Sequence, residues 1–103
     1  MVLPTGTVTF LFTDIEGSSR LWEEHPAAMR EAVARHDALL QAAVVENQGH
    51  VVKMRGDGLH AVFASAQDAV AAAVAGQRAL QAEKWDEGIG QMAVRMGLHS
   101  GSA

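Results

Sequence analysis

The sequence contains no cysteine, which excludes disulfide bonds and thiolate metal sites. It also has no apolar run near the roughly 20 residues that a membrane-spanning helix needs. The first residues lack the basic segment and the long apolar segment of a signal peptide. We therefore expect a cytoplasmic protein with no membrane partner.

Positive charge is scarce as well. Lys and Arg number 8 against 12 Asp and Glu, which gives a formal net charge of −4. Because no stripe of Lys and Arg is present, the composition argues against a nucleic-acid partner. If the ligand is anionic, a metal ion would have to supply much of the positive charge.

The residues that are present suit one soluble domain, because 49% of the 103 residues are hydrophobic and 19% are charged. Residues 7–13, TVTFLFT, are β-branched and aromatic, which predicts a central strand buried on both faces. Pro26 begins a long helical pattern that Gly49 is expected to end. The apolar stripe of this helix is predicted to contain Met29, Val33, His36, Leu40 and Val44.

The middle of the chain predicts a β-hairpin. Residues 50–55, HVVKMR, alternate in polarity and predict a strand, and residues 59–64, LHAVFA, predict another. Between them the GDG sequence at 56–58 is typical of a tight turn.

A second helix and a last strand complete the pattern. Ser65 followed by Asp68 resembles a capping box and predicts an alanine-rich helix over 66–83. Residues 92–99 alternate and predict a fourth strand. Val70, Val74 and Leu80 are expected on or near one face of the helix. The order strand–helix–strand–strand–helix–strand indicates an α+β fold, the ferredoxin-like βαββαβ sandwich.

This topology brings two carboxylates together. In a ferredoxin-like sheet the first two strands are parallel and the third lies between them, antiparallel to both. The end of the first strand therefore lies beside the turn of the hairpin. Because Asp14 ends that strand and Asp57 lies in that turn, we expect both side chains at one edge of the sheet.

Two converging aspartates suit a hard cation such as Mg²⁺ or Mn²⁺, which binds one or two protein carboxylates together with substrate phosphates. Gly17, Ser18 and Ser19 follow at the start of a short helical turn, where backbone N–H groups can hold phosphate oxygens. A metal next to such a turn is typical of phosphoryl transfer. The alternative is that both aspartates merely stabilise turns, for which Asp and Gly are common residues.

Three segments of the chain resemble the class III nucleotidyl cyclases, most of all the bacterial branch that opens with FTDIEGST. They are TVTFLFTDIEGSSRLWEEHP, KMRGDGLHAVFASAQDAVAAA and VRMGLHSG, and together with their spacing they cover essentially the whole chain. The resemblance implies that Asp14 and Asp57 are metal ligands and catalytic residues, joined by the backbone carbonyl of Ile15. It also implies that the backbone N–H groups of Gly17, Ser18 and Ser19 hold the β- and γ-phosphates.

The resemblance further implies a substrate and a partner. Lys53 matches the purine-selecting lysine of the family and favours ATP, because an ammonium group can donate to N1 of adenine. The implied reaction converts ATP to cyclic AMP and pyrophosphate by two-metal catalysis. The site is expected between two subunits in a head-to-tail homodimer, or in a pair with another cyclase domain, where Lys53 faces the partner's Asp14 and Asp57.

The chain also departs from the family pattern. Family domains continue beyond the position of residue 103, into a second purine-selecting residue, an Asn-x-x-x-Arg helix motif and a phosphate-binding lysine. We therefore expect residues 1–103 to be part of a catalytic domain, either shortened or a natural half-domain, with little activity alone. Arg55 adds a positive charge near Asp57. This charge could help to neutralise phosphate, but we favour the interpretation that Arg55 pairs with a surface acid.

Two other functions remain as alternatives. The chain could be a non-catalytic nucleotide-binding or dimerisation module that regulates a full-length cyclase. It could also be a polymerase-like or diguanylate-cyclase-like palm domain, although FTDIEGSS and Lys53 argue against that function.

Overall fold

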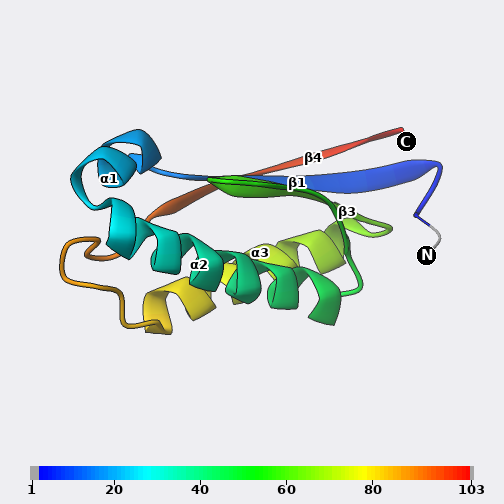
Figure 1. Ribbon diagram of the computed structural model, residues 1–103. Helices are drawn as coiled ribbons and strands as arrows, with labels where there is room; N and C mark the ends of the chain where they lie inside the picture. Colours follow the sequence, from blue (N-terminus) through cyan, green and yellow to red (C-terminus); the bar gives the residue numbers. More distant parts are fainter. Residues whose placement is uncertain (1–2, 103) are drawn as a thin grey trace.

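The computed structural model describes residues 3–102, which form a four-stranded sheet and three helices (Figure 1). The strand order is β2-β3-β1-β4, and every neighbouring pair is antiparallel. This is the predicted α+β ferredoxin-like order. The elements are β1 (Thr7–Ile15), α1 (Ser18–Glu24), α2 (Pro26–Glu46), β2 (His50–Arg55), β3 (Gly58–Phe63), α3 (Ala66–Ala82) and β4 (Val94–Ser102).

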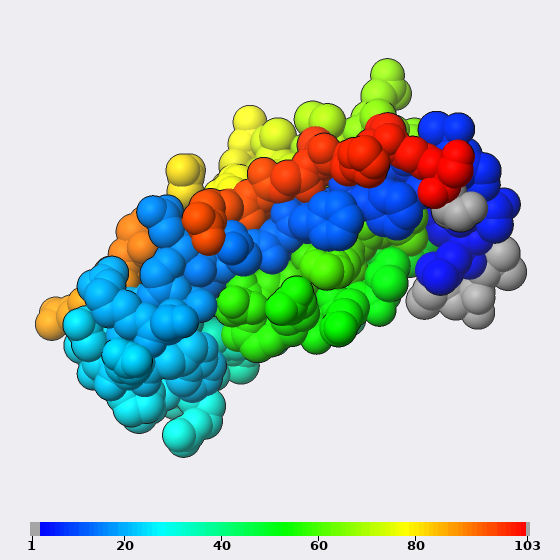
Figure 2. Space-filling view, turned by 90° about the horizontal axis from the view of Figure 1, so that it is seen from above, coloured from blue at the N-terminus to red at the C-terminus, as the bar shows by residue number. Residues whose placement is uncertain are grey.

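The two long helices, α2 and α3, pack on one face of the sheet (Figure 1). The opposite face is open, and Figure 2 shows β4, β1 and β3 lying side by side on it without a covering helix. No helix within residues 3–102 has the length and apolar character to cross a membrane.

The core lies between the sheet and the helices. The stripe predicted for α2 is confirmed, because all five of its residues are buried. The sheet meets this stripe with alternate residues of its two central strands, which are Leu11, Ile15, Leu59, Ala61 and Phe63. Burial of these side chains fixes both central strands against the helices.

The prediction that the first strand is buried on both faces is wrong. Leu11 and Ile15 face the helices, whereas Phe12 is 41% exposed on the open face. The reason is that both helices pack on the same side of the sheet, so that β1 is central within the sheet but covered on one side only. The strand also extends to Ile15 and includes Asp14.

The packing face of α3 agrees with the prediction at Leu80 but not at the two valines. Ser65 caps the helix as expected, since its Oγ accepts a hydrogen bond of 3.0 Å from the backbone N–H of Asp68. Val70 and Val74, however, are 49% and 44% exposed. The buried face is formed by Ala69, Ala72, Gly76 and Leu80. Small residues are used there because α3 approaches α2 closely: a Cβ at Gly76 would lie 2.9 Å from a Leu40 methyl group.

The end of α2 is also different from the prediction. The left-handed residue that follows the helix is Gln48, with φ of 68°, and not Gly49. Gly49 is required for another reason, because a Cβ at this position would collide with the ring of Phe63. The left-handed residue predicted at Gly49 is therefore Gln48, two residues after the last helical residue, Glu46.

Candidate active site

The end of β1 lies against the turn between β2 and β3. The backbone N–H of Ile15 donates a hydrogen bond of 2.7 Å to the carbonyl oxygen of Asp57. A second hydrogen bond joins the same segments, because the backbone N–H of Leu59 donates to the Thr13 hydroxyl at 3.0 Å. These two contacts bring the segments of Asp14 and Asp57 together at one edge of the sheet, as the topology predicts.

Gly58 makes this close approach possible. A Cβ on Gly58 would collide with the carbonyl oxygen of Thr13. The residue therefore has to be glycine for the turn to reach β1. The sequence predicts this glycine only as part of a tight turn. Its positioning role depends on β1, where Thr13 lies 46 residues before Leu59.

The segment that follows β1 turns into the short helix α1. Gly17 adopts a left-handed conformation, with φ of 69°, immediately before this helix. The backbone N–H groups of Ser18 and Ser19 belong to its first turn, where no intrahelical acceptor exists. The Ser18 hydroxyl also points toward Asp57 and lies 3.5 Å from its Oδ2. The three predicted phosphate-binding residues thus adjoin the two aspartates.

Arg95 on β4 is a site residue that our sequence analysis missed. Asp14 and Arg95 are direct partners in the β1–β4 register. The Nε of Arg95 donates to Oδ1 of Asp14 at 2.9 Å, and its Nη2 donates to Oδ2 at 2.7 Å. Hydrogen bonding by this guanidinium holds the pKa of the Asp14 carboxyl below its usual value.

A hollow of about 410 Å³ lies beside this ion pair on the open face of the sheet. It is lined by Phe12, Thr13, Asp14, Arg55, His60, Arg95, Met96 and Gly97. Within residues 3–102 Arg55 forms no ion pair, so the structure does not support our interpretation that it pairs with a surface acid. The hollow therefore presents two guanidinium groups, one of which is neutralised by Asp14.

Lys53 does not line the hollow of its own chain. It lies on β2 opposite His60, and His60 in turn is the partner of Phe12 on β1. Residues that are paired across strands share a face of the sheet. Lys53 is therefore exposed on the open face.

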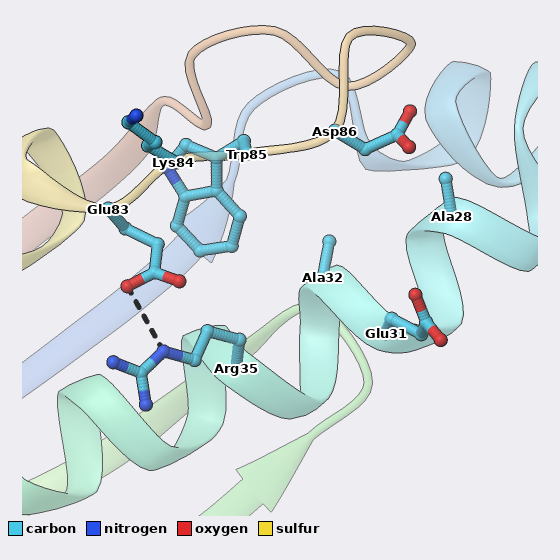
Figure 3. Close-up of a pocket in the computed structure, with 8 residues that line it drawn as sticks. All are labelled: Ala28, Glu31, Ala32, Arg35, Glu83, Lys84, Trp85 and Asp86. Atoms are coloured by element: carbon cyan, nitrogen blue, oxygen red, sulfur yellow. Dashed lines mark ion pairs between the residues drawn. The ribbon is translucent and has the colours of Figure 1, made fainter.

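A second hollow, of about 270 Å³, lies between α2 and the loop after α3 (Figure 3). Arg35 of α2 pairs there with Glu83 at 3.1 Å, and Trp85 forms part of the wall. None of the predicted site residues lines it, so it is not connected with the aspartates.

The oxygen atoms near Asp14 and Asp57 fit a metal ion that takes its other ligands from a bound substrate and from water. No group of three or more His, Cys, Asp or Glu side chains within the described residues could hold a metal by itself. Two carboxylates and the Ile15 carbonyl nevertheless offer the hard oxygen atoms that Mg²⁺ and Mn²⁺ prefer, and Mg²⁺ commonly takes its remaining ligands from phosphates and water.

A family model described as the adenylate and guanylate cyclase catalytic domain matches residues 2–103. The chain belongs to this family. The resemblance seen in the three sequence segments is thereby confirmed. Catalytic domains of this family act on nucleotides, generally use divalent metal ions and work as dimers.

Individual proteins and structures are also similar to this chain. An uncharacterized protein of Mycobacterium tuberculosis is 36% identical over 100 residues, which are 95% of this chain and 32% of that protein. An adenylate cyclase of Podospora anserina is 39% identical over 67 residues, which are 65% of this chain and 3% of that protein. A structure of adenylate cyclases from Trypanosoma brucei in their monomeric state has a TM-score of 0.87 and 28% identity, and the match covers 96% of this chain and 58% of that one. The chain thus spans less than two thirds of each of these relatives.

Proposed function

We propose that the chain contributes one half of an adenylate cyclase site, which converts ATP to cyclic AMP and pyrophosphate at a dimer interface. The observation that carries this proposal is the meeting of Asp14 and Asp57 beside the first turn of α1. The hydrogen bond of 2.7 Å from Ile15 to Asp57 fixes that meeting through the backbone. A metal site needs such rigidity, because its ligands tolerate little displacement.

In this proposal the chain's own residues bind and orient the substrate. The carboxylates of Asp14 and Asp57 and the carbonyl of Ile15 would hold Mg²⁺ or Mn²⁺. The first backbone N–H groups of α1, with Gly17 before them, would bind the β- and γ-phosphates. Divalent ions in such a site promote ionisation of an attacking hydroxyl and stabilise charge on the triphosphate.

The reaction is an intramolecular displacement. The ribose 3′-oxygen forms a bond to the α-phosphorus, its proton passes to solvent water, and the bond from the α-phosphorus to the oxygen that bridges it to the β-phosphorus breaks. Pyrophosphate carries away the electron pair of that bond. The residues of this chain would act by positioning the ends of the triphosphate, which accounts for much of the catalysis in phosphoryl transfer.

The position of Lys53 supports a site shared between two copies. Lys53 is exposed on the open face but lies outside the hollow that contains Asp14 of the same chain. In a head-to-tail homodimer, or in a pair with another cyclase domain, the open faces would meet and Lys53 would reach adenine bound at the partner's aspartates. Lys53 would then select ATP.

Purified protein tests the proposal in two measurements. We expect Mn²⁺ to bind in a calorimetric titration and Asp57→Asn to abolish binding, whereas equal binding by both proteins would contradict the metal site. We expect little or no cyclic AMP from Mn²⁺-ATP, because the groups that the family supplies beyond the matched segments are needed for the transition state. Robust turnover that is abolished by Asp57→Ala would overturn the expected inactivity but support the cyclase site.

A regulatory module is the second candidate, favoured by the observation that Arg95 engages both oxygen atoms of the Asp14 carboxylate. Such a module would pair with a longer cyclase and supply only its own half of the site. Co-expression with a complete cyclase of the family separates the two functions. A rise in cyclic AMP that requires Asp57 supports a catalytic half, and a change that persists in Asp57→Asn supports regulation alone.

A further inference from the structure

The Asp14 carboxylate uses both of its oxygen atoms in one contact. Arg95 approaches it with two parallel N–H groups, at 2.9 Å to Oδ1 and 2.7 Å to Oδ2. The two residues are direct partners across β1 and β4, so that the sheet itself fixes their positions. A guanidinium that contacts a carboxylate in this bidentate way is the strongest form of such a pair.

The same oxygen atoms are those that a divalent ion would take. A carboxylate cannot direct the same lone pairs toward a guanidinium and a metal ion at once, and the two cations repel each other at short range. Arg95 must therefore move away from at least one oxygen of Asp14 when a metal ion binds there.

The displaced guanidinium would have a place to go. Arg95 lines the hollow on the open face together with Arg55 and His60. An anionic polyphosphate bound at the aspartate edge would face this hollow and could accept the hydrogen bonds that Asp14 has given up. The exchange of partners would leave both cations neutralised.

We propose that Arg95 competes with the divalent cation for Asp14, so that metal binding is weakened until an anionic polyphosphate accepts the released guanidinium. This inference rests on the proposed metal site. It assigns to Arg95 a positioning role. Metal binding at Asp14 releases the guanidinium of Arg95, and the polyphosphate pairs with that guanidinium, so that each ligand favours binding of the other.

Two neighbouring arginines allow a matched test. Arg95 is bonded to Asp14, whereas Arg55 lines the same hollow and is in no ion pair of residues 3–102. Loss of either removes one positive charge near the aspartates, but only loss of Arg95 frees the carboxylate oxygens. The comparison therefore separates direct competition from simple charge repulsion.

The experiment measures Mn²⁺ affinity of the purified chain by calorimetry, without nucleotide, in wild type, Arg95→Ala, Arg95→Lys and Arg55→Ala. Because exposed ion pairs contribute little free energy, we expect Arg95→Ala to tighten Mn²⁺ binding by about three- to fivefold. Arg95→Lys keeps the charge but loses the bidentate contact, so its affinity should lie between those of wild type and Arg95→Ala. Arg55→Ala should change the affinity by less than about twofold, because exposed charges are well screened.

A spectroscopic measurement checks the exchange directly. In a Mg²⁺ titration followed by NMR, the Nε–H signal of Arg95 should shift together with the carboxyl carbon of Asp14, and the Arg55 signal should stay in place. An Arg95 signal that does not move while the Asp14 carbon shifts would overturn the proposal.

The outcomes distinguish this inference from the proposed function. Mn²⁺ binding that requires Asp57 but is equally strong in wild type and Arg95→Ala overturns the competition and leaves the metal site standing. Equal tightening by Arg95→Ala and Arg55→Ala also overturns it, in favour of charge repulsion. If no variant binds Mn²⁺, the metal site and the competition both fail.

Discussion

Gly58 illustrates how one residue positions the site. Its backbone lies so close to β1 that a Cβ would collide with the Thr13 carbonyl. The neighbouring Gly56 has no atom within 4 Å of the position that its Cβ would occupy. The two glycines of one turn therefore have different roles, although the sequence gives them the same appearance.

We expect Gly58→Ala to lower the free energy of unfolding by roughly 1–3 kcal/mol, because the added methyl group forces the turn away from β1. The same displacement should weaken Mn²⁺ binding, since it moves Asp57 relative to Asp14. Urea denaturation and calorimetry measure the two effects. Gly56→Ala is the control and should change both only slightly, and an equal loss in the two variants would contradict the role given to Gly58.

For single residues, the sequence predicts those site residues whose proximity follows from the strand order alone. Asp14 and Asp57 converge because of the strand order, which follows from the pattern of elements. Arg95 could not be found in this way, since it resembles any exposed arginine in an alternating strand. Its role appears only when the register places it directly opposite Asp14, and register depends on contacts between distant segments.

Among the elements, the end of α2 is informative. Gln48 has φ of 68°, a conformation in which a side chain is unfavourable and glycine is the preferred residue. The next position cannot exchange roles with it, because Gly49 has to be free of a Cβ to pass the Phe63 ring. The backbone at the end of α2 is therefore strained at Gln48, and a glycine at this position should increase the stability of the protein.

We expect Gln48→Gly to raise the free energy of unfolding by about 0.5–1 kcal/mol, because it relieves this strain. Gln41 is an exposed residue within the same helix, and Gln41→Gly should lower stability by about 1 kcal/mol instead. Urea denaturation of the two variants measures these changes. Destabilisation by both substitutions would show that the end of α2 carries no such strain.

The pattern of elements was largely predictable, but the faces they bury were not. Residues 7–13 contain few polar residues and predict burial on both faces, yet Phe12 is exposed. Val70 and Val74 were expected on or near one face of α3 with Leu80, but only Leu80 of the three is buried, together with alanine and glycine. In both cases the outcome depends on how closely and on which side a helix approaches, which hydrophobic periodicity does not specify.

For the whole molecule, the open sheet face is the surface through which two copies are proposed to meet. Phe12 is exposed there and lies in contact with two other rings, Phe10 at 6.1 Å and His60 at 4.8 Å between centroids. Exposed aromatic clusters of this kind are common at protein interfaces. The fold class that places this cluster was correctly predicted, because the order of strands and helices defines it.

If the dimer forms through this face, Phe12→Ser should weaken self-association by more than about tenfold, because aromatic residues at the centre of an interface dominate its energy. Val74→Ser is the control, since Val74 is similarly exposed, at 44% against 41% for Phe12, but lies on α3 on the other side of the sheet. Sedimentation velocity over a range of concentrations measures the association. A monomeric wild type, or an equal effect of the two substitutions, would contradict the head-to-tail arrangement.

The pairing of β1 with β4 has a consequence for the order of folding. Thr9 of β1 and Ser100 of β4 share a hydrogen bond of 2.8 Å although they are 91 positions apart in the sequence. Closing so long a loop is entropically costly, and contacts of this separation slow folding. During synthesis the first strand can pair with β3 once residue 63 has emerged, but its other edge must wait for residue 102. The strand that carries Asp14 thus waits for its second neighbour, and the ion pair with Arg95 can form only after β4 has been synthesised.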